Sequence, residues 1–132
     1  MKYNYYAIIE SENEGYNVRF PDLDGALTCG DTLEEAVYMA KDVLEGYLLI
    51  LENDKEHIPN ASTYKELSLN IKENEQLQLV HADTDIVRHR ENNKVVNKMV
   101  TIPQYLVEIG KRENINFSQT LRNALEEQLN IK

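Results

Sequence analysis

The sequence predicts an α+β protein in two parts: an N-terminal domain of strands and one long helix, and a smaller C-terminal domain of one strand and two helices. Two observations support this division. The spacing of apolar residues changes from that of a strand to that of a helix twice, near residue 30 and near residue 103. The charge also changes, because residues 1–91 carry a net charge of −11 whereas residues 92–132 carry +2. A chain of 132 residues is not expected to hold a second large core.

Three short strands are predicted in the first 30 residues. YNYYAIIE, at residues 3–10, is rich in aromatic and β-branched side chains, which favour a strand. SENEG then provides a turn, and residues 16–20 alternate between apolar and polar side chains. PDLDG, at residues 21–25, is dense in turn-forming residues, and residues 26–29 supply the third strand.

A long helix is predicted after the third strand. Thr32 and Glu35 have the spacing of a capping box, in which each side chain satisfies a free amide at the start of the helix. An apolar stripe at helical spacing then runs from Leu33 to about Glu52, long enough to cover one face of the sheet. Gly46 inside this helix costs roughly 1 kcal/mol relative to alanine, which is tolerable if close packing needs the space.

The remainder of the first domain is predicted to be a connection and one more strand. Residues 53–62 form the connection, and QLQLVH, at residues 76–81, forms the strand. The following eleven residues, 83–93, have few apolar side chains and mixed charges, which is typical of a linker. We therefore expect an N-terminal domain at residues 1–82, a linker at 83–93 and a C-terminal domain at 94–132.

The segment KVVNKMVTIPQYL, at residues 94–106, predicts a strand that ends where a helix begins. Apolar and polar side chains alternate along residues 95–102, so Val100 and Ile102 share one face of the strand. Pro103 has no amide hydrogen and a φ preset for a helix, so the strand ends there and a helix runs to about Glu113. Ser118 is a good N-cap for a second helix with apolar residues at helical spacing.

One strand and two short helices cannot form a stable core alone, because the strand has an unpaired edge and the apolar stripes have little to cover them. Pairing with a second copy solves both problems, since two strands can meet antiparallel about a two-fold axis with four helices beneath them. We therefore expect a homodimer through residues 94–132, with any higher order left open. The alternative is that this strand adds to the first domain's sheet and the helices cap that domain.

The N-terminal motifs resemble those of the HicB antitoxin family. GYNVRFPDLDGALTCGDTLEEA, at residues 15–36, has the family's F-P-D-L-x-G turn and its G-D-T-x-E-E-A helix start in the family's order. Gly25-Ala26 departs from the usual Gly-Cys. The resemblance implies a βββαβ partial ribonuclease-H-like domain that binds and masks a HicA-like ribonuclease toxin, a small basic protein. An acidic domain suits such a partner.

The C-terminal segment resembles the ribbon-helix-helix fold that many HicB antitoxins carry, with T-I-P at the strand end and N-F-S before the second helix. That resemblance implies a ribbon-helix-helix dimerisation domain that binds operator DNA and represses the protein's own transcription. The outward face of the ribbon would enter the major groove. The candidate groove contacts are Asn97, Met99 and Thr101, and the candidate phosphate contacts are Lys94, Lys98, Ser118, Gln119, Thr120 and Arg122. Lys98 departs from the pattern, since it falls on the face predicted to be buried.

The turn after the second strand supplies the candidate toxin contacts. These are Asp22, Leu23 and Asp24, which lie in the family's characteristic motif. The alternative is that the two acids simply form the turn, as acids in turns usually do.

Other kinds of chemistry receive little support from the sequence. No cofactor or metal is expected, because the three histidines lack the spacing of a metal site and the lone Cys29 reads as a small hydrophobe. Catalysis is not expected either, since ribonuclease-H-like enzymes need several converging carboxylates, and the only acid of the first strand, Glu10, lies at its end. No membrane span or secretory signal is expected, and a chain without disulfides suits the cytoplasm.

The alternative function is a stand-alone ribbon-helix-helix regulator whose N-terminal domain senses a small molecule.

Overall fold

The computed structural model describes residues 1–92 and 94–131. The chain divides into two compact parts, Met1–Asn92, here called unit 1, and Asn93–Lys132, called unit 2.

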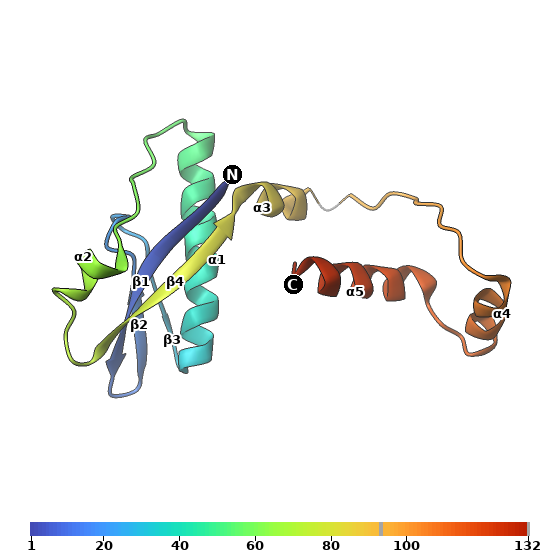
Figure 1. The fold of residues 1–132 in the computed structure, drawn as a ribbon, viewed down its shortest axis with the longest axis horizontal. Helices are drawn as coiled ribbons and strands as arrows, with labels where there is room; N and C mark the ends of the chain where they lie inside the picture. Colours follow the sequence, from blue (N-terminus) through green and yellow to red (C-terminus); the bar gives the residue numbers. More distant parts are fainter. Residues whose placement is uncertain (93, 132) are drawn as a thin grey trace. The chain divides into compact units, whose positions relative to one another are not determined.

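Unit 1 is built on a four-stranded antiparallel sheet (Figure 1). The strands predicted from the sequence are confirmed to within two residues at each end. The sheet order is β3-β2-β1-β4, with β1 at Lys2–Glu12, β2 at Gly15–Arg19, β3 at Leu27–Gly30 and β4 at Glu75–Asp83. β1 and β2 form a hairpin, and β4 pairs with the other edge of β1, so β1 is central and β3 and β4 are the two edges.

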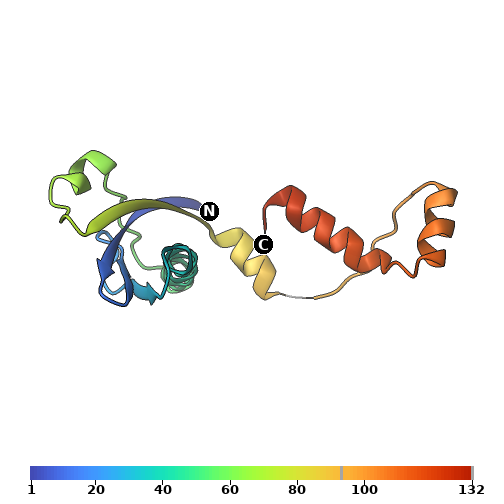
Figure 2. The ribbon, with the colours of Figure 1, turned by 90° about the horizontal axis from the view of Figure 1, so that it is seen from below.

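Helix α1 (Leu33–Asn53) covers one face of this sheet (Figure 2). Thr32 caps it as predicted, because its hydroxyl accepts a hydrogen bond from the Glu35 amide at 3.1 Å. The apolar stripe of the helix packs on alternate residues of the strands, which gives one core. Its fully buried side chains include Ile9, Val18, Leu23, Ala36, Ala40, Leu44, Leu48 and Ala82.

Two short helices of unit 1 were not predicted. α2 (Tyr64–Ser68) lies on the sheet face opposite α1, where the Tyr64 ring meets the Tyr6 ring edge to face at 5.8 Å. α3 (Thr84–Glu91) occupies most of the range 83–93, which the sequence predicted to be a linker. That prediction is wrong for 84–91, because α3 is stabilised by ion pairs to α1 rather than by an apolar stripe.

Unit 2 contains α4 (Gln104–Arg112) and α5 (Phe117–Leu129), preceded by residues 94–103, which have no regular secondary structure. Both predicted helices are confirmed, with Pro103 at the N-cap of the first rather than inside it. The strand predicted at 95–102 is not formed in the single chain. A strand requires a neighbour for its backbone hydrogen bonds, and the described residues of unit 2 supply none.

Two glycines of unit 1 give opposite predictions for the same substitution. A Cβ at Gly30 would lie 2.5 Å from the Ala36 amide nitrogen, so β3 can approach α1 only without a side chain there. A Cβ at Gly46 would meet nothing within 4 Å, so close packing does not account for that glycine. We expect Gly30→Ala to lower the free energy of unfolding by about 1–3 kcal/mol and Gly46→Ala to raise it by about 0.5–1 kcal/mol. Urea denaturation measures both. A stabilising Gly30→Ala would contradict the close approach of β3 and α1.

Candidate functional site

The turn predicted to contact a toxin is held inside unit 1 by its own side chains. The Asp22 carboxylate accepts hydrogen bonds from the Ser62 amide at 2.8 Å and from the Ser62 hydroxyl at 2.5 Å. Leu23 is 1% exposed and belongs to the core. The Asp24 carbonyl accepts a hydrogen bond from the Tyr47 hydroxyl at 2.7 Å. The turn therefore fastens the connection after α1 to the sheet. Leu23 cannot contact a partner as it stands, and only the Asp24 side chain is fully exposed.

A polar cluster around Glu52 joins β1, the end of α1 and the start of α3. Glu52 Oε2 accepts hydrogen bonds from the Tyr3 hydroxyl at 2.6 Å and from the Thr84 hydroxyl at 2.8 Å. Its other oxygen accepts one from the Arg88 guanidinium at 2.9 Å, which also donates to the Asn53 side chain at 2.8 Å. This cluster fixes where the chain leaves unit 1.

The pKa values of Glu52 and Tyr3 are shifted by the hydrogen bonds and charges of this cluster. Burial alone would raise the pKa of Glu52, but the hydrogen bonds from Tyr3 and Thr84 and the charge of Arg88 outweigh it, so this pKa is lowered. Burial, the hydrogen bond to Glu52 and the charge of Glu52 raise the pKa of Tyr3 to about 12. Glu52 is therefore charged and Tyr3 neutral at pH 7, as the hydrogen bonds require.

The sequence contains capping signals for α2 and α3, the two helices that were not predicted. Asp83 caps α3 by accepting a hydrogen bond from the Asp85 amide at 3.1 Å, and three basic residues end the helix, as the helix dipole favours. α2 begins with Thr63 followed by Glu66, the spacing of a capping box, and the Thr63 hydroxyl accepts from the Glu66 amide at 3.2 Å.

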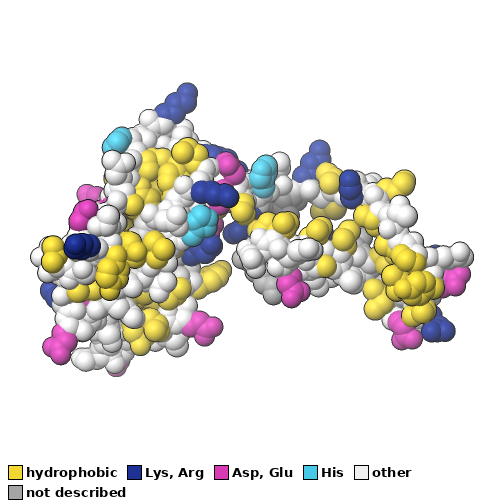
Figure 3. Space-filling view, viewed as in Figure 1, with side chains coloured by type: hydrophobic (Ala, Val, Ile, Leu, Met, Phe, Trp, Pro, Cys, Tyr) yellow, Lys and Arg dark blue, Asp and Glu magenta, His cyan; other side chains and the backbone are white. Residues whose placement is uncertain are grey.

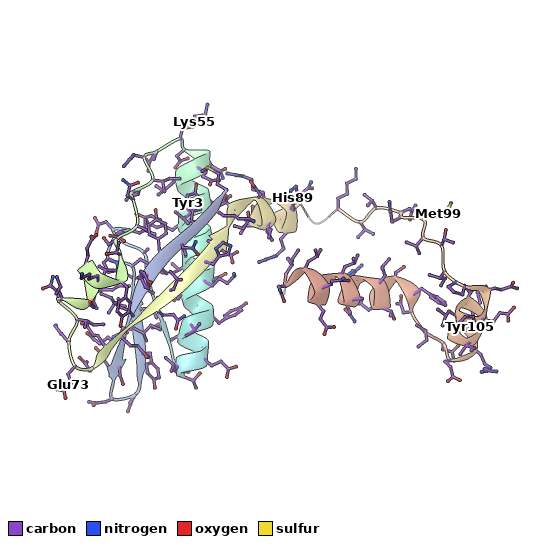
Figure 4. The ribbon with its side chains drawn as sticks, viewed as in Figure 1. Tyr3, Lys55, Glu73, His89, Met99 and Tyr105 are labelled. Carbon is purple, nitrogen blue, oxygen red and sulfur yellow. The ribbon has the colours of Figure 1, made fainter. Side chains whose placement is uncertain are left out.

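The predicted groove-contacting residues lie in the segment before α4. Asn97, Met99 and Thr101 are all exposed, and Met99 points away from the chain at 93% exposure (Figure 4). The predicted inner residues Val100 and Ile102 are less exposed, at 52% and 40%. The side chains of Lys94 and Lys98 are also exposed.

A tight joint connects α4 to α5. The Ile115 amide donates to the Gly110 carbonyl at 2.9 Å, and Asn114 adopts a left-handed conformation with φ of 57°. A Cβ at Gly110 would lie 2.6 Å from the Phe117 ring, so this glycine allows the ring to pack against α4.

The start of α5 differs from the prediction by two residues. Asn116, rather than Ser118, is the N-cap, and its side chain accepts a hydrogen bond from the Gln119 amide at 3.0 Å. The Thr120 amide donates to the Asn116 carbonyl at 3.0 Å, so the free amides at this helix start are those of Phe117 and Ser118. On the helix surface, the Gln119 side chain links Asn123 and Arg122. Ser118, Gln119, Thr120 and Arg122 are all exposed there.

The apolar side chains of unit 2 stay accessible in the single chain (Figure 3). α4 and α5 bury only Gly110 fully, whereas their stripe residues are 38–60% exposed. This set comprises Tyr105, Leu106, Ile109, Phe117, Leu121, Leu125 and Leu129. Unit 2 therefore has helices in place but no closed core of its own.

The described residues offer no centre for metal chemistry. Across residues 1–92 and 94–131, no three His, Cys, Asp or Glu side chains gather as metal ligands would. Within those same residues, no helix combines the length and apolar character that a membrane crossing requires. Cys29 is exposed rather than buried, contrary to the prediction of a small hydrophobe.

Comparison with known proteins identifies the family. The family model described as HicB-like antitoxin of bacterial toxin-antitoxin systems matches residues 5–128, which span both units. The chain belongs to this family. Antitoxin HicB 2 of Photorhabdus laumondii is 30% identical over 116 residues, which cover 88% of this chain and 84% of that relative.

Solved structures of HicB proteins share the fold of this family member. A structure described as a toxin-antitoxin complex from Streptococcus pneumoniae matches with a TM-score of 0.59 and 24% identity, over 97% of this chain and 99% of that one. The antitoxin HicB of Burkholderia pseudomallei matches with a TM-score of 0.52 and 22% identity, over 98% of both chains. A HicA3 and HicB3 toxin-antitoxin complex matches with a TM-score of 0.51 and 24% identity, over 61% of this chain and 99% of that one. At these identities the likeness establishes the mixed α+β fold.

The cluster around Glu52 gives a stability prediction with a defined pH dependence. A carboxyl whose pKa is lower in the folded state than in the unfolded state stabilises the fold above the unfolded pKa, about 4.3 for Glu, and loses that effect as the pH falls. We expect Glu52→Gln to reduce the free energy of unfolding by about 1–3 kcal/mol at pH 7 and by less at pH 4. Urea denaturation at the two pH values tests this, with the exposed Glu56→Gln as the control. A difference that does not change with pH would contradict the role of the Glu52 charge.

Proposed function

We propose that the chain neutralises a HicA-like ribonuclease toxin through unit 1 and, as a dimer through unit 2, binds operator DNA and represses its own transcription. The observation that carries this proposal is the family match across residues 5–128, which includes both units of the chain. In this proposal the division of labour follows the two compact units, Met1–Asn92 and Asn93–Lys132. The protein acts in the cytoplasm and is not an enzyme.

The toxin-binding role is supported by charge and by the solved relatives. Residues 1–91 carry a net charge of −11, which attracts a basic protein and repels RNA. Two of the matching structures are described as toxin-antitoxin complexes, one of them as HicA3 with HicB3. Unit 1 would bind the toxin and mask the surface with which it engages RNA.

Dimerisation is supported by the open apolar surface of unit 2. Seven stripe residues of α4 and α5 are 38–60% exposed in the single chain, and residues 94–103 have backbone groups without strand partners. A second copy would supply both missing parts, an antiparallel neighbour for residues 95–102 and apolar helices to cover the stripes. This is the ribbon-helix-helix arrangement.

DNA binding follows from the face that such a ribbon leaves outward. With Val100 and Ile102 turned toward the helices, Asn97, Met99 and Thr101 would project from each strand into the major groove. An Asn side chain can pair with adenine, and the Thr and Met side chains can contact a thymine methyl. The free amides of Phe117 and Ser118 at the start of α5 would hold a backbone phosphate, with Lys94, Lys98 and Arg122 as further contacts.

Toxin neutralisation is tested by RNA cleavage. We expect the full chain to inhibit RNA cleavage by the HicA-like toxin of the same operon, with complete inhibition near equimolar amounts. The chain alone should leave RNA intact, with and without Mg²⁺. Uninhibited cleavage at a several-fold excess of the chain would reject the antitoxin assignment to this partner.

Sequence-specific DNA binding is tested by two substitutions in the predicted ribbon. Asn97→Ala and Thr101→Ala should each weaken binding to the promoter duplex of the chain's own gene by about 1–3 kcal/mol, because a base contact is lost. Fluorescence anisotropy at constant salt measures this, and inhibition of the toxin should not change. Asn70→Ala, in unit 1, is the matched control. If DNA binding survives both ribbon substitutions, the groove contacts lie elsewhere.

A further inference from the structure

The free edge of β3 presents backbone groups that no other strand uses. The Phe20 amide donates to the Ala26 carbonyl at 3.2 Å, so Ala26 faces β2. In an antiparallel pair this orientation alternates, so Thr28 also faces β2 while Leu27 and Cys29 turn their amides and carbonyls to the outer edge. Among the described residues, no hydrogen bond reaches these outward groups. The edge can therefore accept another strand.

The other edge of the sheet is better protected. The same alternation turns the backbone groups of Leu79 and His81 in β4 outward. The Gln78 side chain donates to the Leu79 carbonyl at 3.0 Å, and the Lys41 ammonium donates to the His81 carbonyl at 3.3 Å. Covering an edge with side chains is a known way to prevent strand addition. β3 has no such cover.

A small groove lies beside the β3 edge on the sheet face opposite α1. Its volume is about 210 Å³, and Leu27 on its wall is 66% exposed. The groove is lined by Glu10, Asn17, Val18, Arg19, Leu27 and Thr28. It offers an apolar contact directly next to the free backbone groups.

The surroundings of this edge are acidic. Glu12, Glu14 and Asp31 line a larger open hollow at the tip of the β1–β2 hairpin, which adjoins Cys29. Arg19 does not offset them, because its guanidinium lies 2.7 Å from the buried Glu75 carboxylate and this ion pair is neutral overall. The hydrogen bond from Arg19 lowers the pKa of Glu75, so that carboxylate stays charged. The net field at the β3 edge is negative.

We propose that the free edge of β3, with the groove beside Leu27, is where a basic extended segment of the toxin docks by adding a fifth strand to the sheet. This inference rests on the proposed antitoxin function and deepens it by naming the surface. The added strand would pair with the outward groups of Leu27 and Cys29, place an apolar side chain in the groove, and direct Lys or Arg side chains to Glu12, Glu14 and Asp31. Such a contact uses the strand that follows the turn at Asp22–Asp24, where Asp22 and Leu23 are themselves held inside unit 1.

A proline test separates strand addition from general binding. In Cys29→Pro the outward amide is removed without loss of a β2–β3 hydrogen bond. His81→Pro makes the same backbone change on the β4 edge and is the control. We expect Cys29→Pro to weaken binding to the HicA-like toxin of the operon at least tenfold, by isothermal titration calorimetry, and His81→Pro to weaken it less than twofold. Circular dichroism confirms that each variant is folded.

A charge test uses the two ends of unit 1. The double variant Glu12→Lys/Glu14→Lys reverses charge at the hairpin tip, which lies at the same end as Glu73 in Figure 4. Asp54→Lys/Glu56→Lys makes the same change at the opposite end, beside Lys55. The first variant should lose at least tenfold in affinity and the second less than threefold, and this comparison decides the matter if Cys29→Pro does not fold.

The outcomes distinguish this inference from the function on which it rests. If the unmodified chain fails to bind the toxin, the proposed function is overturned and the docking edge with it. If the unmodified chain binds and the folded β3-edge and hairpin-tip variants bind equally well, only the docking edge is overturned. Equal losses in the His81→Pro and Cys29→Pro variants would also overturn it, because the effect would then not be specific to β3.

Discussion

Helix α1 packs on one face of the sheet, and where it begins it lies so close to β3 that no side chain fits between them. Ala36 and Ala40 of the helix and Ala7 and Ala82 of the strands are fully buried at this contact, and Gly30 leaves no room for a Cβ. Successive side chains of a strand point to opposite faces of the sheet. The contact with α1 on one face therefore also determines which side chains point to the other face. The opposite face is therefore determined as well: Leu27, Leu79 and Tyr6 turn away from α1, and the Tyr64 ring of α2 packs on Tyr6 there.

Among its described residues, unit 2 has no packing contact as extensive as that between α1 and the sheet. Unit 1 therefore has a core of its own, whereas unit 2 does not. Its helices are capped and joined by local hydrogen bonds, at Asn116 and between Ile115 and Gly110, so they form without a partner. Across the described residues of unit 2, its apolar stripes stay 38–60% exposed. If a second copy covers this surface, as proposed, the stability of unit 2 would depend on the concentration of the protein.

The sequence predicted those features that depend on local patterns and missed those that depend on distant contacts. Alternation, turn residues and the Thr32 cap located the strands and α1, because the signals lie within a few residues of the element. α3 was missed because it has no apolar stripe: its Asp83 cap is a local signal, but the pair that Arg88 makes with Glu52, 36 residues away, is not. The burial of Leu23 and the hydrogen bond from Ser62 to Asp22 also depend on distant contacts, because they form only once the connection after α1 has folded back onto the sheet. The strand predicted at 95–102 is not formed, because no described residue offers its backbone a partner.

The arrangement inside unit 1 bears on how toxin binding could affect DNA binding. The hairpin tip and the β3 edge lie at one end of unit 1, and α3 with its Glu52 cluster lies at the other, next to residue 92 where the chain leaves (Figure 1). A toxin docked at the β3 edge would not touch the exit of the chain. The contact between Arg88 and Glu52 would therefore stay intact. An effect of the toxin on DNA binding would then have to arise from the added bulk and charge of the complex. An acidic domain bound to a basic protein has a smaller net negative charge, which reduces its repulsion from DNA phosphates. If the chain binds both partners as proposed, toxin binding would therefore strengthen operator binding, and most at low salt.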